Sequence, residues 1–320
     1  MTEKAFKAMQ DAVDVVNTSP HPTYKIASAV FGDDFCVTAT NYWPKAIEKA
    51  IGREKRIGQS SSTIHAETAA LLKAPKTDGA SICITDPFCP NCAKNIAEAG
   101  IKTIYIDHKG FKKKFWEKSG DHFENMSMEI AAKAGISVYE INRKKEKIIT
   151  IYEPQKGYVA SEDSPIQIDP CPESKGSYTQ ILYDMMRHYH NRKFVTALVK
   201  TPEGSTFCMT ARVHAVVGYT IQNDVDIETM MNPGKKYSLL QEPMNRLLMA
   251  ARRKGYTVLT DYLFISQIPT SREQVNMVGA GITNILIGDP YRARNKEAIK
   301  AKNLLEKNKI LTFETCDFLF

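Results

Sequence analysis

The sequence lacks any apolar run long enough to cross a membrane. Its longest uninterrupted apolar segments, such as Leu247–Ala251 and Tyr262–Ile265, are far shorter than the roughly 20 residues that a membrane-spanning helix needs. The first residues, Met1–Phe6, are charged and lead into an amphipathic pattern, without the apolar stretch and cleavage site of a signal peptide. We therefore expect no membrane contact and a cytoplasmic location.

Cysteine is also scarce. The chain has 7 cysteines, an odd number, and only Cys89 and Cys92 are closely spaced. This distribution suits thiols in a reducing compartment better than a disulfide framework, and a metal site is the natural use of the close pair. The formal net charge of +7 favours contact with phosphates, but an excess this small does not distinguish a nucleotide from a nucleic acid.

The length and composition predict a globular protein of two domains. The chain has 320 residues, of which 43% are hydrophobic and 25% charged, and domains of roughly 150 residues are each large enough to bury a core. A polar stretch without apolar periodicity divides the chain, so we expect domains over residues 1–153 and 177–320 with a linker over 154–176. The prolines of this linker are Pro154, Pro165, Pro170 and Pro172.

Strands and helices alternate in the first domain, which predicts a mixed sheet with helices on its faces. We expect strands at Tyr24–Phe31, Phe35–Thr40, Ser81–Thr85, Thr103–Ile106 and Ser137–Ile141. Helices are expected at Lys4–Val16, from near His65, at Pro90–Gly100 and at Asn125–Ala134.

The same pattern of segments returns in the second domain, which indicates that the fold is duplicated in tandem. Three short segments recur in the same order, at offsets of 172, 176 and 181 residues. Offsets that grow slowly along the chain indicate small loop insertions in a duplicated domain. The matched segments are Phe35–Thr40 with Phe207–Arg212, Leu71–Leu72 with Leu247–Leu248, and Ala99–Ile101 with Ala280–Ile282.

The residue types with the clearest chemistry are His65 and Glu67, followed by Cys89 and Cys92. A His-x-Glu and a Cys-x-x-Cys in this order are the signature of zinc-dependent base deaminases. One imidazole and two thiolates give zinc three protein ligands and leave its fourth position for water, as in a catalytic site. Glu67 can reach that water and carry its proton without ligating the metal. Both ligand sets fall at expected helix starts, where the helix dipole favours thiolate.

Other interpretations exist for each part of this motif. His65 alone could be a core or surface histidine, and the cysteines alone could be an ordinary thiol pair or a structural zinc knuckle. A four-ligand structural site would need a further Cys or His, and Cys83, inside the preceding strand pattern, is a poor candidate. The acid beside the histidine therefore favours an open, catalytic site.

With these residues, the segment from about 4 to 142 resembles the cytidine and deoxycytidylate deaminase-like superfamily, in particular the branch of deoxycytidylate and transfer-RNA adenosine deaminases. Cys92–Ile101 looks like the helix and turn of that branch. The resemblance implies an α/β fold of three layers, α/β/α, with a five-stranded mixed sheet, here duplicated in tandem. It also implies that Asn41 contacts the substrate sugar, although a plain turn role stays open. Phe88, which separates Pro87 from Cys89, departs from the family pattern.

In the second domain, every one of these chemical positions carries another residue type, so we expect no zinc there. The domain would then act as a packing partner, a regulator or part of the substrate wall. At the offsets above, Asn41 becomes Val213, His65 becomes Gln241, Glu67 becomes Pro243, Cys89 becomes Thr270 and Cys92 becomes Glu273.

Two basic segments bear on the substrate. Trp43–Ser62 could close over the site, so that Arg53, Lys55 or Arg56 meets a phosphate, or it could be a solvated helix face. Ala66, inside the His-x-Glu motif, is a further candidate substrate contact. Lys109–Lys118 interleaves lysines with aromatic residues, as in a surface for single strands, or is a basic loop with aromatics packed beneath it.

We therefore expect a zinc-dependent hydrolase that deaminates a nucleobase, first of all cytosine in a small nucleotide or nucleoside. A purine, pterin-like or RNA base is the alternative substrate, and nucleic acid stays open as a partner. A nucleic-acid-binding or regulatory protein with a structural zinc is the alternative from another class. The two domains are expected to pack as a pseudo-dimer within the chain, and a homodimer is a further expectation.

Overall fold

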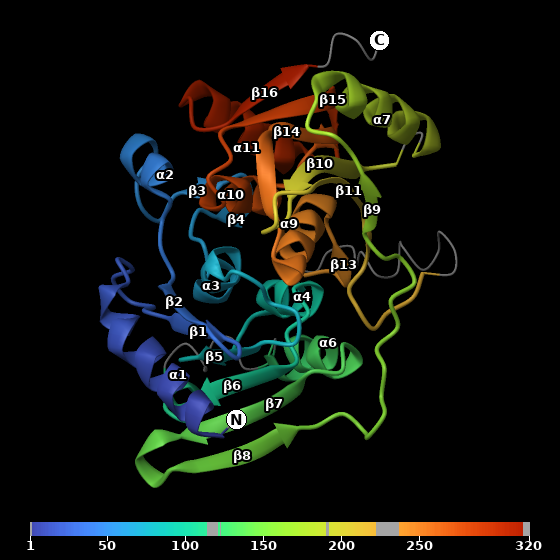
Figure 1. Cartoon of the computed structure of the whole chain (residues 1–320). Coiled ribbons are helices and arrows are strands. Elements are labelled where there is room, and N and C mark those ends of the chain that lie inside the picture. The colour runs from blue at the N-terminus through green and yellow to red at the C-terminus, as the bar shows by residue number, and fades with distance from the viewer. Residues whose placement is uncertain (1, 114–120, 122, 190–191, 222–236, 316–320) are drawn as a thin grey trace.

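Two six-stranded mixed sheets, with helices against them, form the framework of the protein (Figure 1). The structure, a computed structural model, describes residues 2–113, 121, 123–189, 192–221 and 237–315. Helices of both halves of the chain lie between the two sheets in Figure 1. In the part of the chain so described, every helix is too short or too polar to cross a membrane.

The first sheet has its strands in the order β2-β1-β5-β6-β7-β8. They are β1 (Ala27–Phe31), β2 (Cys36–Thr40), β5 (Ser81–Ile84), β6 (Thr103–Asp107), β7 (Ser137–Asn142) and β8 (Lys147–Tyr152). β1 is antiparallel to β2 and β5, whereas β5, β6 and β7 run parallel. β8 is antiparallel to β7.

Both faces of the first sheet are covered by helices. Helix α1 (Thr2–Val15) packs on one face, where Met9 contacts the side of β1 that carries Ala29. Helices α3 (Ala66–Lys73), α4 (Pro90–Glu98) and α6 (Met128–Lys133) cover the other face, which carries Val30 and Ile82. Successive residues of a strand point to opposite faces, and all residues of β1 are buried, so β1 is covered on both faces.

The second sheet repeats the arrangement of five strands. It consists of β9 (Gln167–Pro170), β10 (Phe194–Lys200), β11 (Thr206–Arg212), β14 (Thr257–Ile268), β15 (Asn284–Ala293) and β16 (Thr312–Thr315). From β11 to β16 the order is β11-β10-β14-β15-β16, with the same pattern of antiparallel and parallel pairs as β2-β1-β5-β6-β7. This common topology is what the recurring sequence segments predict.

The helices of the second half occupy equivalent layers. Helix α7 (Lys175–His188) packs on the outer face of the second sheet, where Leu182 meets Phe194 and Phe264. Helices α9 (Pro243–Lys254), α10 (Ser271–Gly279) and α11 (Lys296–Lys307) cover the inner face. Because α9 contacts both α3 and α4, the inner helices of the two halves share one hydrophobic core.

Short elements complete the described chain. They are the helical turns η1 (Val16–Thr18), α2 (Lys45–Ala50), η2 (Gly110–Lys112) and η4 (Arg143–Lys145), the π-helix η3 (Phe123–Ser127), the hairpin β3 (Arg56–Ile57) with β4 (Ser60–Ser61), and the ribbon β12 (His214–Ala215) with β13 (Leu240–Gln241).

The predicted five-stranded sheet is one strand too small, because each of the two large sheets has a sixth strand at one edge. β8 follows β7 after a tight turn at Arg143–Lys145 and Glu146, whose φ of 48° is left-handed. The run of charges in that turn hid the strand that follows it. β9 pairs with β11 inside the segment expected to be a linker, so residues 167–170 are part of the second sheet.

Candidate metal centre and substrate cavity

Two helix starts in the first half bring the motif residues together. His65 is the residue directly before α3, and Cys89 is the residue directly before α4; both have extended backbone. Pro90 opens α4, where its missing N–H costs nothing, and Cys92 follows in the first turn. The backbone N–H groups at both helix starts favour negative charge on the thiols.

The spacing of the three side chains fits a zinc ion. The Nδ1 atom of His65 lies 3.5 Å from Sγ of Cys89 and 3.3 Å from Sγ of Cys92, and the three ligand atoms lie within 4.8 Å of one another. A tetrahedral ion with Zn–S bonds of about 2.3 Å and a Zn–N bond of about 2.0 Å places its ligand atoms roughly 3.5 Å apart. One imidazole and two thiols are also the donor types that zinc prefers.

The thiol of Cys89 is prepared for ligation. The hydrogen bond from the Cys92 thiol, and then the charge and hydrogen bond of His65, hold the pKa of Cys89 well below its usual range against the effect of burial. The thiolate is the form of cysteine that binds a metal. Cys89 is therefore the first of the two thiols to ionise.

Glu67 stands beside the three ligands in the first turn of α3 and is 4% exposed. Burial raises its pKa to about 7, although the charge of His65 acts in the opposite direction. A carboxyl group with a pKa near the working pH can both accept and donate a proton. Glu67 has the properties of a proton carrier.

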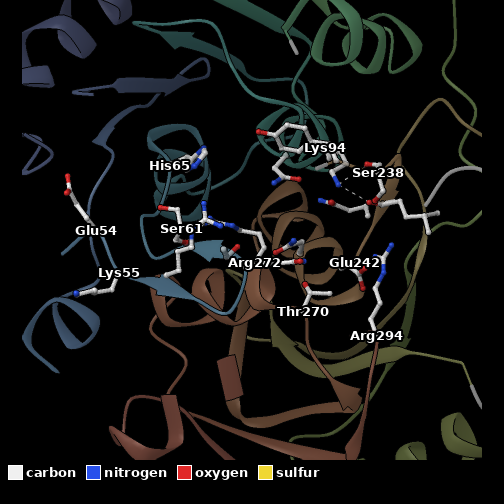
Figure 2. A pocket seen from close by; sticks show the side chains of 18 residues that line it. Glu54, Lys55, Ser61, His65, Lys94, Ser238, Glu242, Thr270, Arg272 and Arg294 are labelled. Atoms are coloured by element: carbon white, nitrogen blue, oxygen red, sulfur yellow. Dashed lines mark hydrogen bonds and ion pairs between the residues drawn. The ribbon is translucent and has the colours of Figure 1, made fainter. Parts of the chain in front are cut away.

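A cavity of about 710 Å³ opens next to this centre and is lined by both halves of the chain. Figure 2 shows His65 and Arg272 near its middle, Lys55 at one end, and Lys94, Glu242 and Arg294 at the other. Pockets of roughly 300–1,000 Å³ are typical for small-molecule ligands. The cavity therefore has room for a ligand of nucleotide size.

The structure places the predicted substrate contacts in different surroundings. Arg56 lines the cavity from the β3–β4 hairpin, together with the neighbouring Lys55. Arg53 lies outside the described lining; it pairs with Glu48 at 2.5 Å and stacks over Trp43. A phosphate contact by Arg53 would need this pair to break.

Asn41 and Ala66 are both buried and lie outside the described lining of the cavity. The Asn41 amide donates to the Tyr24 carbonyl and accepts from Ser19 and from the Ile26 backbone. These bonds favour the turn role of Asn41. Its contact with a sugar stays a prediction.

The basic segment Lys109–Lys118 is only partly described. Lys113 pairs with the buried Asp86 at 2.6 Å, and Phe111 packs edge-on against Phe123. Residues 114–118 lie outside the described residues. The contacts of residues 109–113 favour a loop with its aromatic residue packed beneath it.

The positions of the second half that correspond to the zinc motif form hydrogen bonds within the fold. Thr270 and Glu273 make a capping box at the start of α10, and Glu273 also pairs with Lys193 at 2.5 Å. The Gln241 amide donates to Asn95. Across the residues described, the His65, Cys89 and Cys92 group is the one cluster of three suitable metal ligands.

Lys94, Arg272 and Arg294 also line the cavity, although the sequence motifs did not predict them as site residues. A weak signal was present, since Lys94 and Arg272 both lie near starts of helices that the repeat pairs with each other, α4 and α10. Their approach to one cavity depends on how the two halves pack, which sequence offsets do not give.

Comparison with known families identifies the first part of the chain. Residues 2–108 match the cytidine and deoxycytidylate deaminase zinc-binding region. This segment is similar to the cytidine and deoxycytidylate deaminase-like superfamily. The match includes all three residues of the metal centre and Glu67, so zinc is the cofactor that this family and the ligand group both indicate.

Several curated proteins are similar over part of the chain. ComE operon protein 2 of Bacillus subtilis is 39% identical over 75 residues, an uncharacterized deaminase of Aliivibrio fischeri 28% over 99, and the deoxycytidylate deaminase of phage T4 33% over 90. These segments cover 21%, 31% and 27% of this chain. They cover 40%, 65% and 41% of the relatives, so the chain spans less than two thirds of each.

Solved structures show more distant similarity. The dCMP deaminase of cyanophage S-TIM5, crystallised with dCMP and dUMP, aligns with a TM-score of 0.33 and 19% identity over 43% of this chain and 97% of its own. RibD of Acinetobacter baumannii aligns with a TM-score of 0.28 and 20% identity, over 43% of this chain and 35% of its own.

Proposed function

We propose that the protein is a zinc-dependent hydrolase that deaminates a nucleobase, cytosine in a nucleotide or nucleoside. The observation that carries this proposal is the buried Glu67 beside the His65, Cys89 and Cys92 group, at a cavity of ligand size. A structural zinc site needs no such acid. The family match supports the reaction, and the similar phage T4 protein, a deoxycytidylate deaminase, supports the base.

In the proposed reaction water adds to the amino-bearing ring carbon, the carbon–nitrogen bond breaks, and ammonia leaves as a carbonyl forms. When bound, zinc supplies Lewis-acid activation of the attacking water. Glu67 accepts a proton from that water, donates it to the ring nitrogen, and later carries a proton to the departing amine. The pKa of Glu67, raised by burial to about 7, suits both directions of transfer.

We also propose that His65, Cys89 and Cys92 are the zinc ligands and that the second half, residues 177–320, has no metal of its own. In this proposal residues 1–153 form the catalytic domain, and the two domains arose by tandem duplication. Their packing across α3, α4 and α9 supports a pseudo-dimer within the chain. A homodimer and a cytoplasmic location stay predictions.

A substrate panel tests the proposal. Zinc-loaded protein is incubated with cytosine and adenine nucleotides, nucleosides, free bases and single-stranded oligonucleotides, and ammonia release is measured. We expect release from a small cytosine nucleotide or nucleoside. Ammonia release from a purine alone, or from an oligonucleotide alone, would show that the proposed substrate is wrong. The absence of ammonia release from every compound would refute the deaminase function.

A further inference from the structure

Two cations in the cavity wall are partly or fully buried, and neither has a carboxylate partner in the part of the chain that the structure describes. Lys94, on α4, is 6% exposed, and its ammonium donates to the carbonyls of Ser238 and Leu240 at 3.2 and 2.9 Å. Arg272, on α10, donates to the carbonyls of Thr63 and Ser61 at 2.9 and 2.8 Å. Among the described residues, no carboxylate lies within 4.0 Å of either charge.

Among the described residues, two acids line the same cavity, Glu54 and Glu242, and neither pairs with these cations. Glu242 lines the same cavity, but Lys193 and Arg294 both pair with it. The loaded metal centre does not supply a counter-charge either, because two thiolates and one divalent ion have a net charge of zero. A buried charge without a partner is costly, so the two cations favour an anion in the cavity.

Both side chains keep donors for such an anion. A guanidinium has five N–H donors and an ammonium three, and the carbonyl bonds above use two of each. In Figure 2 the Arg272 side chain extends toward Ser61 beneath His65, and Lys94 lies on the other side of the cavity beside Ser238. Both residues line the same cavity as His65, so an anionic group bound there would share the cavity with a base at the metal centre.

We propose that the carboxyl-terminal half, although it has no metal ligands, completes the substrate cavity, and that Arg272 with Lys94 binds the phosphate of a nucleoside monophosphate. Arginine suits this role because its planar fork donates two parallel hydrogen bonds to phosphate oxygens. The inference rests on the proposed function for the position of the base.

The cavity favours a single nucleotide over a strand. The cavity of about 710 Å³ is lined by two halves that share one core, and Ser238 and Leu240 line it beside Lys94. A continuing strand would need a basic groove that runs past the site and binds successive phosphates. Two buried cations in the wall of one cavity suit one phosphate better than the successive phosphates of a strand.

The test measures binding by calorimetry in the zinc-loaded Glu67→Gln protein, so that no ligand is consumed. Cytidine 5′-monophosphate, cytidine and a single-stranded cytosine oligonucleotide are compared. Arg272→Gln and Lys94→Gln keep two N–H donors for the carbonyls and lose the charge. Lys300→Gln is the matched control: Lys300 is an exposed cation of α11 that pairs only with Glu297 among the described residues.

We expect the parent to bind the monophosphate at least about tenfold more tightly than cytidine, since a hydrogen bond between charged groups contributes about that factor. Arg272→Gln and Lys94→Gln should each weaken binding of the monophosphate about tenfold and leave binding of cytidine unchanged. Lys300→Gln should change the affinity for neither ligand. Arg272→Lys should retain part of the preference.

The proposal would be overturned if the variants lost equal affinity for the monophosphate and for cytidine, or if the parent did not prefer the monophosphate. Tighter binding of the oligonucleotide than of the monophosphate would overturn the choice of a single nucleotide. Urea unfolding shows whether each variant is folded. If one of Arg272→Gln and Lys94→Gln fails to fold, the binding data of the other variant decide the test. Ammonia release by the wild-type protein is measured separately. Phosphate-dependent binding without ammonia release would refute the deaminase function and keep this inference.

Discussion

Arg246 of α9 and Glu98 of α4 form an ion pair at 3.3 Å between the two halves of the chain, with 3% and 2% of their side chains exposed. Arg246 also donates to the carbonyls of Arg212 and Ser164 at 3.0 and 2.6 Å. Because α4 starts directly after Cys89 and contains Cys92, this pair links the second half to the helix that positions two of the proposed ligands. The second half thereby packs directly against a helix of the candidate metal centre.

Arg246→Met should destabilise the protein by about 3–5 kcal/mol, the cost of leaving one buried charge unpaired. Urea unfolding of the zinc-loaded protein measures the change. Arg253→Met is the matched control, because Arg253 pairs with Asp78 and Glu162 on the surface of the same helix and is 27% exposed. A loss in the Arg246 variant no larger than in the control would contradict a structural role for the pair.

Zinc analysis should find about one ion per chain, bound by the first half. His65→Ala removes the imidazole ligand and should lower zinc binding by at least about tenfold. Cys36→Ala is a control at a cysteine outside the ligand group. Two zinc ions per chain that persist in His65→Ala protein would refute the ligand assignment.

Acid should weaken the fold through Glu242. Burial alone would raise its pKa, but the charges of Lys193 and Arg294 lower it to about 2, compared with 4.5 for the free side chain. A carboxyl group with a lowered pKa in the folded state stabilises the protein above its unfolded pKa, and this contribution is lost as the pH falls from about 4.5 to about 2. The full contribution is about 3 kcal/mol, taking 1.36 kcal/mol per unit.

Unfolding free energies between pH 6 and pH 2.5 check this prediction. The wild-type protein should lose stability more steeply with acid than Glu242→Gln, whose amide does not titrate. Parallel pH profiles for the two proteins would show that Glu242 contributes nothing to the acid sensitivity.

Much of the first half could be predicted from its sequence, because its signals are local. The apolar pattern of β1, the proline at the start of α4 and the spacing of His65, Glu67, Cys89 and Cys92 each depend on neighbouring residues. The repeat offsets likewise anticipate the common order of five strands in the two sheets.

The edge strands and the cavity wall could not be predicted in the same way. β8 follows a run of charges, and β9 is formed by a proline-containing segment whose partner, β11, lies almost 40 residues away. Arg272 reaches the site only because α10 packs beside the β3–β4 hairpin, more than 200 residues away in sequence. Such contacts depend on tertiary packing, which a single sequence does not report.

The most direct test of the deaminase function is ammonia release by wild-type and Glu67→Gln protein at equal zinc content. The amide keeps the size and burial of Glu67 but does not carry the proton, so we expect normal zinc content and a loss of turnover of at least about 100-fold, the usual lower contribution of a general acid–base. Near-normal release of ammonia by the Glu67→Gln protein would contradict the proposed mechanism.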